Sequence, residues 1–278
     1  MLLFYFGIII FSILAGVIGA LVGIGGGIII IPILILIFHI NIKIAIGASI
    51  ISVIATSSSA ASVYLKDKII NIRVGMLLEI ATTIGAITGA EIMGILNTTV
   101  LLYIFAFVLL ISIIPLLKNR DQEVDEKVEN DNIANYLKLS SSYYDKLKNK
   151  EIHYNVTNIP GGFIIMYIAG LISGLLGIGS GVFKVLALDD VMKLPMKVST
   201  TTSNMMIGVT AAASAFIYLI NGYINPYIAI PVMIGVFIGS YYGTKLIGKT
   251  SNVYLKKIFI LVILVIAIEM ILRAMHVL

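Results

Sequence analysis

The stretch Gly23-Ile24-Gly25-Gly26-Gly27 decides the fold, because it interrupts a long run without any charged side chain, residues 1–42. As one straight helix, this run would measure about 63 Å, twice the thickness of the hydrocarbon layer of a membrane. The run must therefore break. Glycine adopts backbone angles that other residues resist, and Pro32 then removes one helix hydrogen bond. The sequence predicts a broken helix at 23–27 with a short or re-entrant arm after it.

The composition shows that the rest of the chain is of the same kind. Of 278 residues, 59% are hydrophobic and 12% are charged, whereas soluble domains carry about a quarter charged residues. Further apolar runs lie at 45–65, 74–94, 98–117, 159–188, 198–220, 226–247 and 255–275. We therefore predict an all-α polytopic protein of the cell membrane, with about eight transmembrane helices. The first run has no basic start and exceeds signal-peptide length, so it is interpreted as the first span.

Residue usage excludes several kinds of chemistry. The absence of cysteine excludes disulfides and thiolate metal sites, and His39, His153 and His276 show no metal-ligand spacing. No catalytic residue, metal or cofactor is predicted, and the chain is not expected to be an enzyme. We interpret the net charge of +5 as a signal of membrane topology, so nucleic acid is not an expected partner.

The two halves of the chain resemble each other. A shift of 154 positions aligns 16–94 with 170–248 without a gap and gives about 21 identities. Gly177-Ile178-Gly179-Ser180-Gly181 then stands opposite Gly23–Gly27. We predict two homologous transmembrane repeats, 1–117 and 159–278, an organisation typical of secondary transporters. A duplicated scaffold without a transport role is the alternative.

The polar segment 118–158 lies between the repeats. It is predicted to be a loop, cytoplasmic, with a short helix near 131–148. If the chain turns back at each glycine motif, the repeats are inverted, and the loops 66–73, 118–158, 189–197 and 245–257 share one face. These loops hold 3, 7, 2 and 4 Lys and Arg residues, 16 of the chain's 19. Because basic residues prefer the cytoplasmic side, this asymmetry favours inversion, and parallel repeats stay open.

The two glycine segments are the first candidate site. A broken helix inside a membrane exposes backbone N–H groups, which suit an anionic solute. Close helix packing is the alternative role for small residues. Lys184 lies just after the second segment in an apolar run, where a charge is costly and marks a candidate anion partner. The alternative role for Lys184 is that its long side chain extends to place the ammonium at the membrane interface.

Hydroxyl and amide side chains follow each segment and could donate to anion oxygens; the alternative roles are helix capping and bonds between helices. The candidate substrate-binding residues are Gly25, Gly26, Gly27, Ser49, Gly179, Ser180, Gly181, Lys184, Ser203 and Asn204. Thr56-Ser57-Ser58-Ser59 is a weaker candidate. Glu79, Glu91 and Glu269 could couple transport to protons, but interfacial positions are favoured for them.

The motifs resemble those of the sulfite exporter TauE/SafE family, also called the toluene sulfonate uptake permease family. The stretches that carry the resemblance are Gly23–Gly27 with Pro32, Gly47-Ala48-Ser49, Gly177–Lys184, Pro195–Val198, Thr202-Ser203-Asn204 and Gly208–Ala213. The departures are Leu186, where a proline is common, and Ala48, where a threonine is common.

The resemblance implies a permease for sulfite or a sulfonate that works by secondary transport with ion coupling. Composition and spacing by themselves support only a duplicated carrier with helix breaks that suit an anion. The expected partners are a small anionic solute and membrane lipid, and a homo-oligomer stays open. The alternatives are an anion channel and an intramembrane protein without transport activity.

Overall fold

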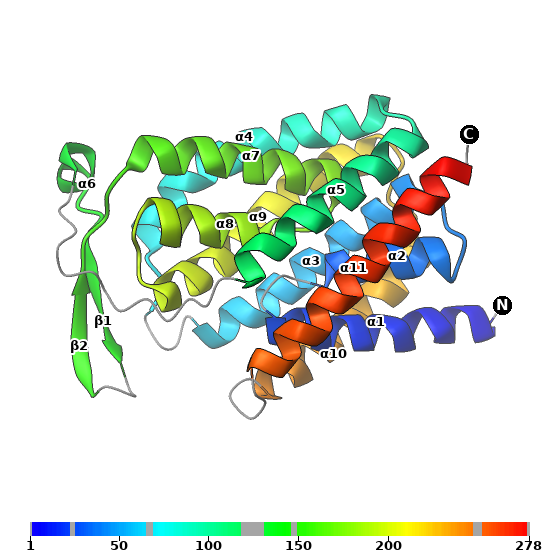
Figure 1. Ribbon diagram of the computed structural model, residues 1–278, viewed down its shortest axis with the longest axis horizontal. Coiled ribbons are helices and arrows are strands. Elements are labelled where there is room, and N and C mark those ends of the chain that lie inside the picture. Colours follow the sequence, from blue (N-terminus) through cyan, green and yellow to red (C-terminus); the bar gives the residue numbers. More distant parts are fainter. Residues whose placement is uncertain are drawn as a thin grey trace.

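The computed structural model describes residues 2–22, 26–64, 69–117, 131–145, 149–246 and 252–276. Most of these residues are helical, and Figure 1 shows the helices running roughly along one long axis. The elements are α1 (Leu2–Val22), α2 (Gly27–Leu36), α3 (Ile42–Tyr64), α4 (Ile72–Ile95), α5 (Thr98–Leu117), α6 (Asn132–Tyr136), β1 (Ser141–Asp145), β2 (Lys150–Tyr154), α7 (Ile159–Leu176), α8 (Gly181–Leu186), the π-helix η2 (Ala187–Val191), α9 (Met196–Ile220), α10 (Pro226–Leu246) and α11 (Asn252–His276).

Glycines allow two pairs of helices to touch along their backbones: α1 packs on α10, and α4 packs on α7. A Cβ added to Gly85 would lie 2.2 Å from the Tyr167 carbonyl oxygen, and one added to Gly239 would lie 2.1 Å from that of Ile13. Gly85 and Gly239 are aligned positions of the two halves. Small residues allow this close approach inside membranes, where helix packing depends on direct contact.

The chain turns back after α1 and again after α7. Phe38, beyond the end of α2, packs edge-on against Phe4 near the start of α1, at 5.3 Å between ring centroids. Met192, beyond η2, contacts Gly162 near the start of α7, and its carbonyl accepts a hydrogen bond from the Thr157 N–H at 3.3 Å. Each glycine motif is therefore followed by an arm that returns to the end from which the preceding helix started.

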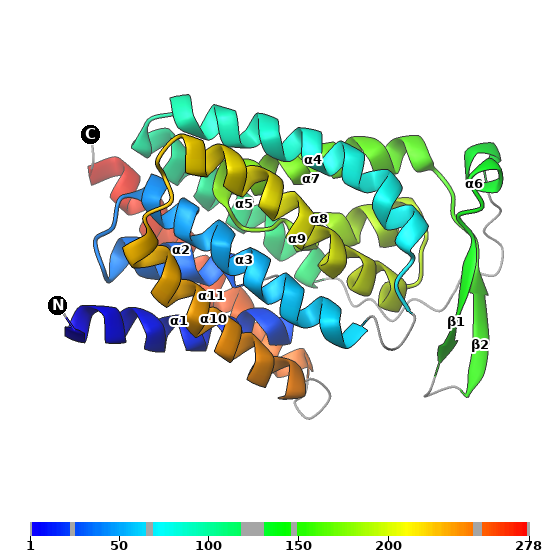
Figure 2. The same ribbon diagram turned by 180° about the vertical axis from the view of Figure 1, so that it is seen from behind.

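Aligned helices of the two halves run in opposite directions. In Figure 1, α1 and α3 run from right to left, whereas α7 and α9 run from left to right. The reverse view in Figure 2 shows α3 and α9 side by side at the centre, and these two helices are in contact. Both chain ends marked in Figure 1 lie at the right, opposite the β-strands.

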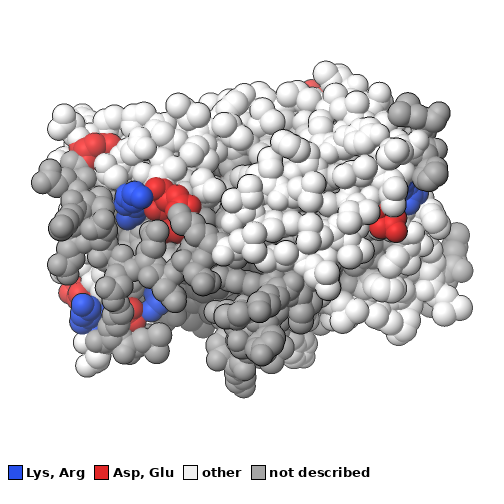
Figure 3. Space-filling model, in the orientation of Figure 1, with Lys and Arg blue, Asp and Glu red and all other residues white. Residues whose placement is uncertain are grey.

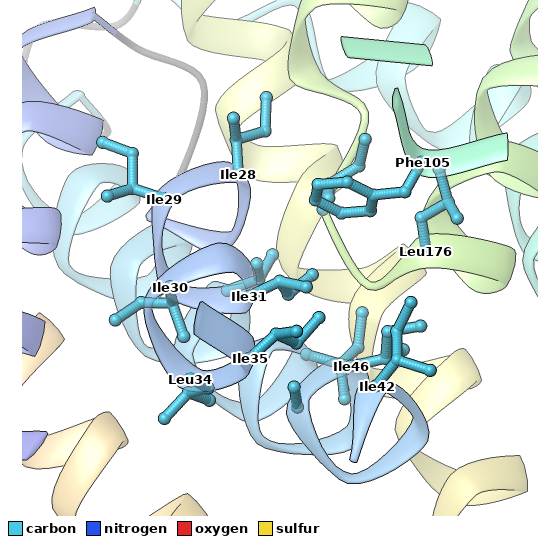
Figure 4. Packing of buried hydrophobic residues seen from close by; sticks show 14 of the residues in the cluster. Ile28, Ile29, Ile30, Ile31, Leu34, Ile35, Ile42, Ile46, Phe105 and Leu176 are labelled. Carbon is cyan, nitrogen blue, oxygen red and sulfur yellow. The ribbon is translucent and has the colours of Figure 1, made fainter. Parts of the chain in front are cut away.

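The short helix α2 lies inside the bundle. Its ten residues measure about 15 Å, half the thickness of a bilayer core. Ile30 and Ile31 are fully buried, and Figure 4 shows them packed among Ile42, Ile46 and other apolar side chains. The helix is continuous through Pro32, so the break lies before Gly27 and the proline does not extend it.

The outer surface is apolar. On the face shown in Figure 3, most of the described charged side chains lie toward the two ends of the long axis, and the upper part between them is mostly white. Five helices within the described residues are long and apolar enough to cross a membrane: α1, α4, α7, α9 and α10. Large apolar side chains such as Phe107, Ile114 and Phe216 are exposed on the outer surface of the bundle, as expected for contact with lipid.

The segment between the halves is not only a loop. Of the region near 131–148 where a short helix was expected, only α6 is helical. The strands β1 and β2 form an antiparallel hairpin that was not predicted. Tyr143, Ile152 and Tyr154 of the hairpin are buried against η2 and the ends of α4 and α9. Asn71, which caps α4, donates to the Leu139 carbonyl at 2.8 Å. The described part of this segment therefore covers one end of the bundle, where α4 of the first half meets η2 and α9 of the second.

An ion pair holds the hairpin to α9. The Lys197 ammonium donates to both carboxylate oxygens of Asp145 at 2.9 Å, and the carboxylate is buried. Lys197→Met would remove both hydrogen bonds that this ammonium makes to the carboxylate, at a cost of about 1–2 kcal/mol for a partly exposed pair. We expect amide hydrogen exchange in 131–158 to become roughly tenfold faster, as measured by mass spectrometry.

The exposed Lys193 provides the matched control for this prediction. Lys193 lies in the loop just before α9, and it forms no ion pair seen among the described residues. Lys193→Met therefore removes one positive charge without breaking such a pair, and the exchange rates should stay as in the parent. Equal exchange rates in the Lys197→Met and Lys193→Met proteins would contradict the role given to the ion pair.

Candidate functional site

The second glycine segment forms a sharp break between α7 and α8. Helix α7 ends at Gly177, whose φ is +66°, and Gly179 has a φ of +75°. These are left-handed conformations that glycine adopts without strain. Ser180 is also left-handed, with a φ of 47°, which is unusual for a residue with a side chain. The break therefore places irregular backbone inside the bundle, where only a buried or cavity-lining position is tolerated.

The two glycine segments meet at the centre of the molecule. A Cβ on Gly27 would lie 2.7 Å from the Ser49 hydroxyl oxygen and 2.9 Å from the Gly177 carbonyl oxygen. The Ser49 hydroxyl donates to the Gly177 carbonyl at 2.8 Å. Ser203, aligned with Ser49, donates to the Gly181 carbonyl at 3.3 Å. Two of the three hydroxyls predicted for the site, those of Ser49 and Ser203, thus bind backbone carbonyls at the second break.

Lys184 lies in the interior and not at the membrane surface. Its side chain is fully buried, and its ammonium donates to the Thr210 hydroxyl at 2.5 Å. The interfacial alternative considered for Lys184 is therefore wrong. Thr210 also contacts one carboxylate oxygen of Glu79, Oε1, at 2.6 Å. A buried cation, a hydroxyl and a carboxylate from α8, α9 and α4 thus form one polar group, which we call the Lys184 cluster.

Two buried oxygen atoms beside the second break have no hydrogen-bond partner among the described residues. They are the Ser180 hydroxyl oxygen and the second carboxylate oxygen of Glu79, Oε2. The Ser180 carbonyl accepts from the Lys184 backbone N–H at 3.1 Å, so Ser180 and Lys184 share the first turn of α8. Buried polar atoms are usually paired, and unpaired ones at a helix break point to a ligand or a proton.

The remaining predicted residues are placed as follows. Gly25 lies outside the described residues. Gly26 caps α2, and its carbonyl accepts from the N–H groups of Ile29 and Ile30 at 3.1 Å. Asn204 follows Ser203 on α9 and is buried with it.

Two members of the Lys184 cluster were absent from the predicted site. Thr210 could have been found from its match with Thr56 in the alignment of the halves. Glu79 lies on α4 with its carboxylate turned toward α9. Glu91 and Glu269 are exposed, and the interfacial positions favoured for the three carboxylates stay a prediction.

The charged pair of the cluster has no equivalent at the aligned positions. The position aligned with Lys184 is Ile30 in the first half, and the position aligned with Glu79 is Met233 in the second half. Ile30 is fully buried among apolar side chains (Figure 4). The two arms are therefore similar in backbone but different in chemistry, and the charged side chain lies in the second.

Comparisons with known proteins give one consistent result. A family model described as sulfite exporter TauE/SafE matches residues 8–270. The chain is 25% identical over 272 residues to the probable membrane transporter protein YunE of Bacillus subtilis (strain 168), covering 95% of this chain and 96% of the relative. It is also 25% identical over 249 residues to the probable membrane transporter protein YdhB of that organism, covering 90% and 93%.

A more distant organism supplies a similar protein. The probable membrane transporter protein MJ0441 of Methanocaldococcus jannaschii is 26% identical over 251 residues, covering 86% of this chain and 83% of the relative. No solved structure matches the chain. The family match thus extends over both halves of the chain.

Proposed function

Because this chain belongs to the sulfite exporter TauE/SafE family of membrane transporters, we propose that it is a secondary carrier for a small oxyanion, sulfite or a short sulfonate. The observation that supports an anion most strongly is the burial of Lys184 at the second helix break. A buried charge inside a membrane is costly and is kept where it binds a solute or an ion. The carrier moves its solute without changing it chemically.

The binding site is proposed at the meeting point of the two glycine segments. Lys184 supplies the positive charge, and the Ser180 hydroxyl, which has no partner among the described residues, supplies a donor one helical turn away. Ser49 and Ser203 hold the second break through its carbonyl groups. An oxyanion has several oxygen atoms that accept hydrogen bonds. It therefore matches a site in which the groups still able to form hydrogen bonds are mostly donors.

We also propose that the two halves are inverted repeats that move against each other. The support is the pairing of α1 with α10 and of α7 with α4, each through aligned glycines, and the opposite directions of the aligned helices in Figure 1. Inverted repeats with a site at their interface are typical of carriers that open alternately to the two sides.

The topology follows from the same arrangement. Helices α3, α5 and α11 have 23, 20 and 25 residues, enough to cross a bilayer as helices. Together with the five spans of sufficient length and apolarity they give eight, with α2 and α8 as short arms. The end that bears the β-hairpin holds the basic loops, so we assign it to the cytoplasm and both chain ends to the outside.

The test is uptake of radiolabelled sulfite and a short sulfonate into proteoliposomes containing the purified protein. A carrier gives saturable uptake that an excess of unlabelled anion on the opposite side accelerates. The alternative, an anion channel, gives uptake without this acceleration. No uptake of either anion under any imposed gradient would contradict the substrate class.

A further inference from the structure

The Thr210 hydroxyl has three polar neighbours, and its hydrogen bonds to them can be arranged in more than one way. It lies 2.5 Å from the Lys184 ammonium, 2.6 Å from Glu79 Oε1 and 2.9 Å from the Met206 carbonyl oxygen. A hydroxyl has one hydrogen to donate and two lone pairs to accept. The ammonium only donates and the carbonyl only accepts, so the direction of the bond to Glu79 depends on where the threonine hydrogen points.

Two arrangements satisfy these contacts, and they differ by one proton on Glu79. If Thr210 donates to Glu79, the carboxylate is ionised and balances the charge of Lys184. If Thr210 donates to Met206, its contact with Glu79 is a hydrogen bond only when Glu79 is protonated and donates through Oε1. The same atomic positions therefore accommodate both protonation states of Glu79.

Other titratable side chains near α4 are bonded elsewhere or stand apart. Those on α4, α7, α8, η2 and α9 and in the loop before α9 within the described residues, besides Glu79 and Lys184, are Arg73, Glu91, Tyr167, Asp189, Asp190, Lys193, Lys197 and Tyr218. Arg73 donates to the Lys138 carbonyl, and Tyr218 donates to the Gly174 carbonyl. The buried Asp189 lies on η2, which packs against α7, α8 and α9. Lys184 is thus the cation that faces Glu79 in this region.

Resting on the function proposed above, we infer that Glu79 is the proton-binding residue that couples transport: each monoanion crosses together with one proton carried by Glu79. In the empty site, Lys184 is balanced by the Glu79 carboxylate. An anion that enters the site pairs with the Lys184 ammonium. If Glu79 stayed ionised, the anion and the Glu79 carboxylate would place two negative charges beside one buried cation, which is strongly unfavourable. A proton on Glu79 restores neutrality.

The proton has a defined place on the carboxyl group, the oxygen Oε1, where the Thr210 hydroxyl can accept it in a hydrogen bond at 2.6 Å. The other oxygen, Oε2, is buried and has no hydrogen-bond partner among the described residues. The second half has Met233 at the position aligned with Glu79, so the alignment gives no second proton site of this kind. One proton and one monoanion per cycle make the transport electroneutral.

The probe for this inference is radiolabelled methanesulfonate, which stays a monoanion when the pH changes. Proteoliposomes of the full chain are made one pH unit more acidic outside than inside. The parent should accumulate the anion about tenfold at equilibrium, since one coupled proton contributes a factor of ten per pH unit. An imposed membrane potential should not change this ratio. A response to the potential would overturn the electroneutral stoichiometry.

Glu79→Gln separates the coupling from the transport itself. The neutral amide imitates the protonated carboxyl, so exchange of labelled for unlabelled anion should continue, with a lower half-saturating concentration. Accumulation driven by the pH gradient should be lost, with a ratio near one. Glu91→Gln, at an exposed position of the same helix, should leave both readings as in the parent.

The outcomes distinguish this inference from the proposed function. Exchange that persists in the Glu79→Gln protein together with undiminished pH-driven accumulation would overturn Glu79 as the proton site and leave the carrier standing. No exchange in the parent would overturn both. Glu79→Asp keeps a proton-binding group and should retain accumulation at a lower rate. If the Glu79→Gln protein does not elute as a single species, loss of pH-driven accumulation in the Glu79→Asp protein would overturn Glu79 as the proton site.

Discussion

Lys184→Met is expected to reduce uptake of the transported anion by at least about 100-fold at low anion concentration. Methionine fills a similar volume but has no charge, so an anion that enters the site has no cation beside it. Loss of one partner of a buried ion pair costs about 3–5 kcal/mol, and each 1.4 kcal/mol corresponds to a factor of ten. The measurement is initial uptake into proteoliposomes with equal amounts of inserted protein.

Lys43→Met is the matched control for this variant. The Lys43 ammonium donates to the Gly94 carbonyl at the end of α4, 2.8 Å away, and lies over the Tyr223 ring, so it is also a partly buried lysine with defined contacts. Its partners, the Gly94 carbonyl and the Tyr223 ring, are not members of the Lys184 cluster, so its loss should change stability modestly and leave the half-saturating concentration alone. Equal uptake by the Lys184→Met and Lys43→Met proteins would remove Lys184 from the binding site.

Gly89→Ala is expected to disrupt the bundle although it adds only a methyl group. Its Cβ would lie 2.1 Å from the Leu171 carbonyl oxygen and 2.8 Å from the Leu175 nitrogen of α7. These are backbone atoms that cannot rotate away, so α4 and α7 must separate along their contact. Overpacking of this kind costs about 1–3 kcal/mol, occasionally more. We expect a lower thermal midpoint in detergent and a smaller fraction that elutes as a single species.

Gly94→Ala makes the same chemical change five residues later on the same helix. A Cβ there would lie 3.7 Å from the nearest atom, the Tyr223 hydroxyl oxygen, which is an ordinary contact. Alanine also favours the helix over glycine by about 1 kcal/mol. The Gly94→Ala protein should therefore be as stable as the parent or slightly more so. Equal thermal midpoints for the two alanine variants would contradict the close helix contact.

The features that the sequence predicted are those encoded by residue type over short distances. The glycines of 177–181 have no side chain, so a break could be placed there, and α7 does end at Gly177. Lys184 could be selected because a charge in an apolar run is rare. Pro32 does not end α2, because a proline can lie within a membrane helix whose neighbouring groups adjust to it.

The missed features depend on contacts between distant parts of the chain. Glu79 and Thr210 are 131 positions apart, and nothing in either stretch indicates that they meet. The hairpin has an alternating pattern in Ile152-His153-Tyr154, but Asp145 is polar and faces inward because Lys197 pairs with it. The strands are stabilised by their contact with η2 and α9, which the segment itself cannot reveal.

The central claim, that the anion binds beside Lys184, can be tested by direct binding. The chain has no tryptophan, so Phe183→Trp places a single indole next to Lys184 on α8. Titration with sulfite should change the fluorescence of this protein, excited selectively at the indole, in a saturable way. The change should be absent from the Phe183→Trp/Lys184→Met protein. The same saturable change in both proteins would contradict the account.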